Sequence, residues 1–251
     1  MTLGALLFAR YAYPPNALGY CGADDARTLL EYGDASASDG GLVQLARSFE
    51  GAWPYLELIA HANGIEDPLD PQAVEAYWIG SRLLEQVDPG RLVQQLDDRF
   101  RMRAGRAWTQ LTETLPKHVP PHHNFHVFGV YPWVGLLQAG NVAEPLRVLD
   151  SCRITSGRVH SVSDGVADVL VQPLVWDGRT LGLGPPVPRR AEWRREGLGF
   201  VRDLVPGDWV ALHWDWVCDR LSFRQKEALA YYTSRTLALA NRGAAPATLS
   251  G

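Results

Sequence analysis

The stretch RVHSVSDGVADVLV, residues 158–171, contains the pattern that decides the fold of the C-terminal part of this chain. Apolar and polar residues alternate on both sides of Ser163-Asp164-Gly165, which is typical of two strands joined by a hairpin turn. A second hairpin signal follows at Asp177-Gly178. Strand-rich sequence with closely spaced turns, followed by a helical stretch over 222–239, predicts a small β-barrel with a C-terminal helix.

The first 115 residues differ, because apolar residues recur there with the spacing of amphipathic helices. Asn63-Gly64 marks the end of one predicted helix. Asp70-Pro71 provides the N-cap and first position of the next, which the pattern carries to about Val87. A further helix is predicted over 103–115, before Pro116.

The spacing of apolar residues changes near Gly140 from a helical pattern to alternation, which predicts two parts in one α+β chain. We expect a helical domain over residues 1–145 and a small OB-like β-barrel with a C-terminal helix over 146–241. Residues 243–251 are mostly small, and a disordered tail is expected over 242–251.

Composition excludes several classes of protein. The net charge of −4 argues against nucleic-acid binding, which needs a basic surface. No apolar run has the length of a membrane span, and residues 1–10 lack the basic region and cleavage site of a signal peptide. Cys21, Cys152 and Cys218 are widely spaced and form no CxxC motif. We therefore expect a cytoplasmic protein in a reducing compartment.

Cys152 and His213 are the first candidates for chemistry. The neighbouring Arg153 is expected to lower the pKa of the Cys152 thiol and to favour the metal-binding thiolate. His213 shares one face of a predicted strand with Trp209 and Ala211. A thiolate and an imidazole suit a soft or borderline metal. The alternatives are that Cys152 is a buried small hydrophobe and that His213 is a structural strand histidine.

The spacing of these segments resembles that of a known family. Cys152, Gly157 and Val159 keep the spacing of the N-terminal motif of the HypC family of hydrogenase-assembly chaperones, and 207–213, GDWVALH, is similar to its Gly-Asp-aromatic-Val-x-x-His strand. The resemblance covers about 149–241. Departures from the pattern are Ser156 in place of a proline, an internal cysteine, and an insertion over roughly 176–196. The N-terminal region resembles an uncharacterised bacterial family.

The resemblance implies a carrier and not an enzyme. HypC-type proteins carry iron with its cyanide and carbon monoxide ligands, Fe(CN)2CO, between a HypD-like scaffold protein and the precursor of the [NiFe]-hydrogenase large subunit. By this resemblance Cys152 would bind iron and, with Arg153, contact the partners, and His213 would be an auxiliary iron ligand. Gly157, Gly207 and Asp208 would be structural motif residues.

A histidine-rich segment supports an alternative. His118, His122, His123 and His126 follow one another closely, and histidine is the commonest transition-metal ligand. The alternative function is a helical metal-dependent enzyme using the His118–His126 cluster. His122, His123 and His126 are also candidates for a secondary metal or docking site. No carboxylate pattern such as His-Glu-x-x-His accompanies it. A pure interaction module without metal is the third possibility.

Overall fold

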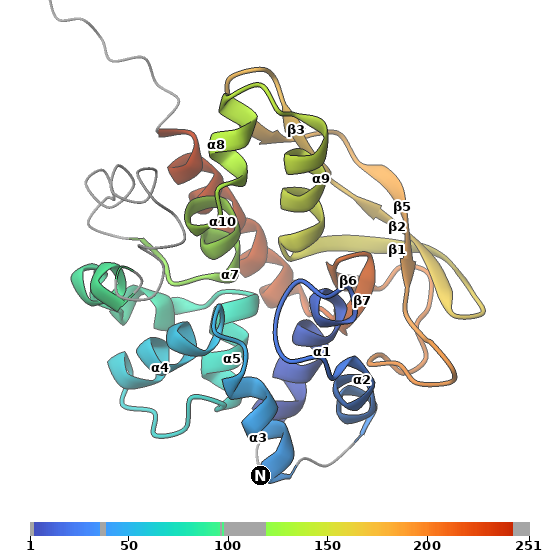
Figure 1. Ribbon diagram of the computed structural model, residues 1–251. Coiled ribbons are helices and arrows are strands. Elements are labelled where there is room, and N and C mark those ends of the chain that lie inside the picture. The colour runs from blue at the N-terminus through green and yellow to red at the C-terminus, as the bar shows by residue number, and fades with distance from the viewer. Residues whose placement is uncertain (1–2, 36–38, 96, 98–118, 243–251) are drawn as a thin grey trace, which may run out of the picture.

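The computed structural model describes residues 3–35, 39–95, 97 and 119–242 of the 251-residue chain. Within these residues helices come first, strands follow, and a long helix ends the fold (Figure 1). The predicted α+β class, with a helical N-terminal part and a C-terminal helix, is therefore confirmed. The predicted helix over 103–115, His118, and residues 243–251 of the predicted tail lie outside the described residues.

The helices of the N-terminal part and of the segment before the strands are α1 (Leu3–Ala17), α2 (Ala26–Asp34), α3 (Gly40–Arg47), α4 (Trp53–Ala62), α5 (Pro71–Trp78), the 3₁₀ helix η1 (Arg82–Gln86), α7 (His123–Phe125), the π-helix η2 (His126–Val130), α8 (Trp133–Gln138) and α9 (Ala143–Cys152). The C-terminal helix is α10 (Phe223–Ala240). Asp70 caps α5 and Asn63 is the C-cap of α4, as predicted.

The predicted continuation of the helix after Asp70 to Val87 is wrong. α5 ends at Trp78, and Gly80 follows with a φ of 102°, a conformation that favours glycine. A Cβ atom at Gly80 would lie 2.1 Å from the ring of Tyr232 on α10. The helix therefore stops where the chain must pass close to α10.

Helix α1 is not predicted by the sequence pattern. Pro14 and Pro15 lie near its end, and proline interrupts a helical signal. The helix is nevertheless central, because it contacts α2, α3 and α5 on one side and β6 and β7 on the other. Its Phe8 and Tyr11 side chains are fully buried. This position brings the α1 backbone to the strands.

The strands are β1 (Thr155–Ser163), β2 (Val166–Val171), β3 (Leu174–Trp176), β4 (Leu181–Leu183), β5 (Val187–Glu192), β6 (Trp209–His213) and β7 (Trp216–Arg220). Five of them pair in the order β1-β2-β5-β7-β6, and β6 pairs again with β1, so that the order closes on itself. β5 and β7 share one parallel pair, Glu192 with Trp216. The predicted turns are confirmed, since Ser163–Gly165 joins β1 to β2 and Asp177-Gly178 joins β3 to β4.

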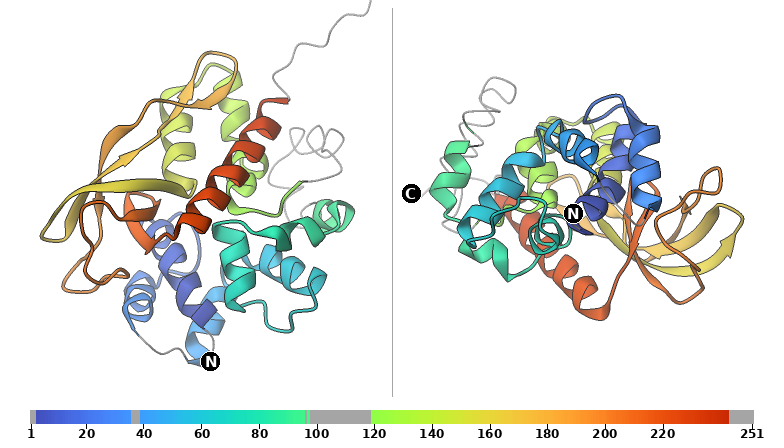
Figure 2. Two further views of the ribbon diagram at one scale, coloured as in Figure 1. Left: turned by 180° about the vertical axis from the view of Figure 1, so that it is seen from behind. Right: turned by 90° about the horizontal axis from the view of Figure 1, so that it is seen from below.

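Strand β6 separates two hydrophobic cores. Val210 and Leu212 belong to the core between the paired strands, whereas Ala211 belongs to the main core that the helical part forms. This is the alternation expected of a strand with both faces buried. The main core therefore extends from the helices into the strands, with α10 lying between the two parts (Figure 2).

The predicted boundary between residues 145 and 146 falls inside α9. Separate folding of the two parts stays a prediction.

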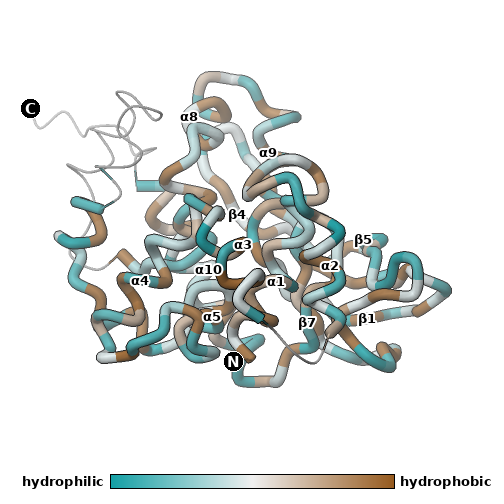
Figure 3. Tube along the Cα trace, turned by 60° about the horizontal axis from the view of Figure 1, so that its bottom comes forward, coloured by the Kyte–Doolittle hydropathy of each residue, from teal (hydrophilic) through white to brown (hydrophobic). Residues whose placement is uncertain are grey.

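Figure 3 shows mixed hydrophilic and hydrophobic colouring along β1 and β5, at the end of the molecule away from α4. No helix among the described residues is long and apolar enough to cross a membrane.

Candidate metal centre

Three side chains that are far apart in the sequence converge between the helical part and β6. A nitrogen of His123, the sulfur of Cys152 and a nitrogen of His213 all lie within 4.8 Å of one another. Ligand atoms bound to one tetrahedral ion would lie roughly 3.4–3.6 Å apart, given typical metal–sulfur and metal–nitrogen bond lengths. We call His123, Cys152 and His213 the Cys/His cluster. It could hold a metal ion after small side-chain movements.

His213 is placed by the alternation of β6. It is the last residue of the strand, on the face that carries Ala211, and therefore points toward α1. Its Nδ1 lies 2.8 Å from the carbonyl oxygen of Tyr11. Because a carbonyl oxygen only accepts, Nδ1 carries the proton and Nε2 keeps its lone pair. Nε2 is buried without a hydrogen-bond partner.

Cys152 is the last residue of α9 and is held from two sides. The backbone N–H of Trp214, just after His213, donates to the Ser151 carbonyl at 2.8 Å. The backbone N–H of Ile154 donates to the Asn124 side chain at 2.9 Å. The end of α9 is thus tied both to the β6–β7 turn and to α7, which fixes Cys152 beside the two histidines.

His123 lies on the short helix α7. Its Nε2 is 2.8 Å from the Cys152 carbonyl oxygen and its Nδ1 is 3.2 Å from the Tyr77 hydroxyl. The Asn124 amide nitrogen also donates to Thr233 on α10 at 3.0 Å. His123 and Asn124 therefore bind the backbone on both sides of Arg153 and hold α7 against the end of α9.

The cluster lines a cavity of 260 Å³ between the two parts of the molecule. Most of its wall is apolar or aromatic and includes Trp78, Trp133 and Trp214. Cys152 is partly accessible, whereas His123 and His213 are 6% and 1% exposed. The cavity gives a small ligand or ion room next to the donor atoms.

Burial determines the charge state of the cluster. It lowers the pKa of His123 to about 4 and the pKa of His213 well below its ordinary value. Burial also raises the pKa of Cys152 to about 12. At neutral pH the two imidazoles are therefore in the form that binds metals, and the thiol keeps a proton that a metal must displace.

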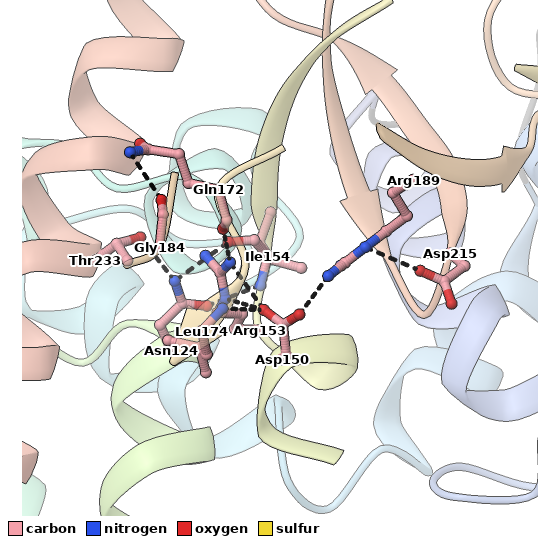
Figure 4. Close-up of polar contacts among 10 residues, drawn as sticks. All are labelled: Asn124, Asp150, Arg153, Ile154, Gln172, Leu174, Gly184, Arg189, Asp215 and Thr233. Carbon is pink, nitrogen blue, oxygen red and sulfur yellow. Dashed lines mark hydrogen bonds and ion pairs between the residues drawn. The ribbon is translucent and has the colours of Figure 1, made fainter. Parts of the chain in front are cut away.

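The expectation that Arg153 lowers the pKa of the Cys152 thiol is wrong. Arg153 is 3% exposed and turns to Asp150, with Nε at 3.0 Å and Nη2 at 2.9 Å from one carboxylate oxygen (Figure 4). It also donates to the Gln172 carbonyl. With its positive charge compensated there, Arg153 joins the α9 end to the strands, and its predicted contact with partners stays a prediction.

The other predicted residues are distributed as follows. His126 lines the cavity but its Nδ1 contacts the Tyr55 hydroxyl at 3.0 Å, and His122 stacks on Tyr232. Among the described residues, the His118–His126 segment contributes only His123 to a group of three metal-binding side chains. The predicted secondary site thus donates one member to the Cys/His cluster.

Gly157, Gly207 and Asp208 have structural contacts. A Cβ at Gly157 would lie 2.4 Å from Val169 on the neighbouring strand, and Gly207 has a φ of 96°. The Asp208 carboxylate accepts from the Arg220 guanidinium at 3.0 Å. These contacts explain why the β1 and β6 segments need these residue types.

Comparison with known families places the chain in the DUF6390 family, described as a family of unknown function. Its model matches residues 1–247 and so spans both parts of the chain. Comparison with curated proteins gave no match, and neither did comparison with solved structures. No match to the HypC family was found. The HypC resemblance therefore rests on the motif residues alone.

Proposed function

We propose that this protein is a HypC-like carrier of the iron precursor of [NiFe]-hydrogenase, with an OB-like arrangement of its paired strands. The observation that supports it most is the convergence of Cys152 and His213. The resemblance paired these two residues from separate sequence segments, and their ligand atoms lie within 4.8 Å of each other. Such a distance is required if both bind one iron.

The donor set suits the proposed cargo. Iron that carries cyanide and carbon monoxide is soft, and thiolate is its natural protein ligand, supported by a neutral imidazole. His213 offers a lone pair on Nε2 without a competing partner, and Cys152 supplies sulfur at the cavity wall. When bound, the iron group would be cargo that the protein delivers, so the protein itself performs no turnover.

The proposed partners are the hydrogenase large-subunit precursor and a HypD-like scaffold protein, in the cytoplasm. Delivery requires that a partner approach Cys152, which lies at the end of α9 beside the β6–β7 turn. We therefore expect the partners to contact this region of the molecule.

The decisive experiment is purification of the full chain without oxygen from cells that make the hydrogenase. We expect bound iron and infrared bands of iron-bound cyanide and carbon monoxide. We also expect the large-subunit precursor or the HypD-like scaffold to be captured, as identified by mass spectrometry. Cys152→Ala should lose the iron, the bands and the partner, whereas Cys218→Ala should keep them. Protein without iron or bands, with equal capture by both variants, would refute the proposal.

A further inference from the structure

We propose that His123 is the third ligand of the metal centre, and that the Tyr77 hydroxyl makes this possible by accommodating either tautomer of the His123 ring. The inference rests on the metal site of the proposed function but does not depend on which metal is the cargo. It gives the helical part of the chain a chemical role, because both His123 and Tyr77 belong to it.

The present hydrogen bonds of His123 define its tautomer. Nε2 lies 2.8 Å from the Cys152 carbonyl oxygen, which can only accept, so Nε2 carries the ring proton. The ring is buried, and burial favours its neutral form. Nδ1 therefore carries a lone pair and accepts a hydrogen bond from the Tyr77 hydroxyl at 3.2 Å. In this state His123 is bonded to protein at both nitrogens.

Metal binding through Nε2, the nitrogen beside Cys152, requires the other tautomer. One proton leaves Nε2 and one joins Nδ1, so the ring stays neutral. The Tyr77 oxygen then accepts from Nδ1–H, and its own proton turns to the Gly51 carbonyl oxygen, which lies 3.4 Å away. Tyr77 thus has a partner for its hydroxyl in both states. The only net proton released when a divalent ion binds is that of the Cys152 thiol.

His213 differs because its tautomer is already suitable for metal. The Tyr11 carbonyl holds the proton on Nδ1, and Nε2 has no partner. The geometry therefore gives one preformed imidazole ligand and one that is released from Cys152 only when metal arrives. Such outer contacts to a ligating histidine fix its tautomer and orientation in many metal sites.

The same helical part supplies a matched control. Tyr55 contacts Nδ1 of His126 at 3.0 Å, with the rings at 89° and their centroids 5.4 Å apart. The Tyr77–His123 rings lie at 81° and 5.6 Å. The two pairs are alike in chemistry, burial and geometry, but His126 belongs to no group of three metal-binding side chains among the described residues. Only the Tyr77 pair should affect the metal.

Titration of the full chain with cobalt(II) under anaerobic conditions tests the proposal. The near-ultraviolet thiolate-to-cobalt band reports Cys152, and the visible d–d bands report the remaining ligands. We expect His123→Ala to keep the thiolate band with weaker, shifted d–d bands. Tyr77→Phe should lower cobalt affinity by roughly 10–100-fold, as outer-contact substitutions do. Tyr55→Phe should bind as the wild type does. Wild-type spectra and affinity in both His123→Ala and Tyr77→Phe would overturn the inference.

A second measurement needs no variant and so is independent of folding defects. ¹⁵N NMR of the wild-type imidazoles reports the protonated nitrogen of each ring. We expect His123 to be protonated on Nε2 without metal and on Nδ1 with zinc(II). A proton that stays on Nε2 in the zinc-loaded protein would overturn the inference while leaving the carrier proposal intact. Absence of the thiolate band from the wild type would instead count against the metal site that both share.

Discussion

Two polar regions of opposite character meet at the C-terminal end of α9, where Cys152 and Asp150 lie. On one side is the Cys/His cluster, whose groups are neutral and which leaves Nε2 of His213 without a partner. On the other side is an ion network centred on Asp150, which accepts from Arg153, Arg189 and the backbone N–H of Leu174 (Figure 4). Polar atoms that are satisfied in this way maintain the structure, whereas the unpartnered nitrogen of His213 is of interest because it lies beside two other metal-binding side chains.

The two regions also differ in what a substitution should do. Breaking the Asp150 network would leave a poorly compensated charge in a protected place, which lowers the free energy of unfolding. Removing a neutral member of the Cys/His cluster leaves no such charge. The first region should therefore respond mainly in stability and the second mainly in metal binding, and the following predictions test this separation.

The largest expected effect is the loss of metal binding in Cys152→Ala. The substitution removes the sulfur, and a buried imidazole pair alone is a weaker site for a soft ion. Cobalt(II) titration should show no thiolate-to-cobalt band, while the urea midpoint of the metal-free protein changes little.

Cys218→Ala is the control for this variant. Cys218 is fully buried in the main core, outside the cluster. The Cys218→Ala protein should lose some stability and keep the thiolate-to-cobalt band. A retained band in Cys152→Ala would show that the thiolate ligand is another cysteine.

The second prediction concerns the opposite side of Cys152. Arg153→Met keeps the apolar stem but leaves Asp150 with Arg189 as its remaining cation, so the free energy of unfolding should fall by about 3 kcal/mol, near the low end for a broken buried pair. Urea unfolding of the metal-free protein measures this loss. Arg147→Met, which breaks an exposed pair with Glu144, should change stability little.

The same Arg153→Met protein should still give the cobalt band in its folded fraction, because the guanidinium hydrogen-bonds to Asp150 and Gln172 and not to the cluster. A loss of metal binding at full folding would mean that the two regions are one functional unit.

Much of the fold could be predicted from local patterns. The turn at 163–165 and the Asp70 cap depend on residues close in sequence, and they were predicted. The convergence of Cys152 and His213 was expected from the spacing of two motifs. His123 as a third member could not be deduced, because its place depends on how α7 packs against α9. The pKa of Cys152 was predicted in the wrong direction, because the sequence reveals neither the burial that raises it nor the turn of Arg153 to Asp150.

The third prediction uses the charge states of the cluster. The thiol, with its pKa raised to about 12, is protonated throughout the neutral range. Each bound ion must displace one proton, so the apparent affinity for zinc(II) should rise about tenfold per pH unit between about pH 6 and 8. Isothermal titration in buffers of different ionisation enthalpy counts the released protons.

The plot of apparent zinc(II) affinity against pH should show no change of slope near the ordinary histidine pKa of about 6.5. The pKa of His123 is lowered to about 4, and that of His213 is also lowered, so both imidazoles stay neutral in the native state down to more acidic solution. Below about pH 6.5, an apparent affinity that changes by more than tenfold per pH unit would mean that more than one proton is displaced. The two rings would then be more exposed to water than the cavity allows.

The smallest expected effect concerns access to the cluster. Tyr20 is 47% exposed, lines the cavity and stacks on Trp214 with ring centroids 4.1 Å apart. Glycines with positive φ lie on both sides of it, at Gly19 and Gly22, and glycine adopts this conformation without strain. Tyr20→Ala should lower the free energy of unfolding by only about 0.5–1.5 kcal/mol, the range for an aromatic pair.

The kinetic effect of Tyr20→Ala should exceed its effect on stability. If the ring covers the entrance, its removal speeds cobalt(II) entry and release together and leaves the equilibrium affinity nearly unchanged, because no ligand is lost. Stopped-flow mixing with cobalt(II), and then with a chelator, measures both rates. Tyr231→Ala, which removes a comparably exposed tyrosine from α10, should leave them unchanged. Unchanged rates in Tyr20→Ala would mean that metal reaches the Cys/His cluster by another side of the cavity.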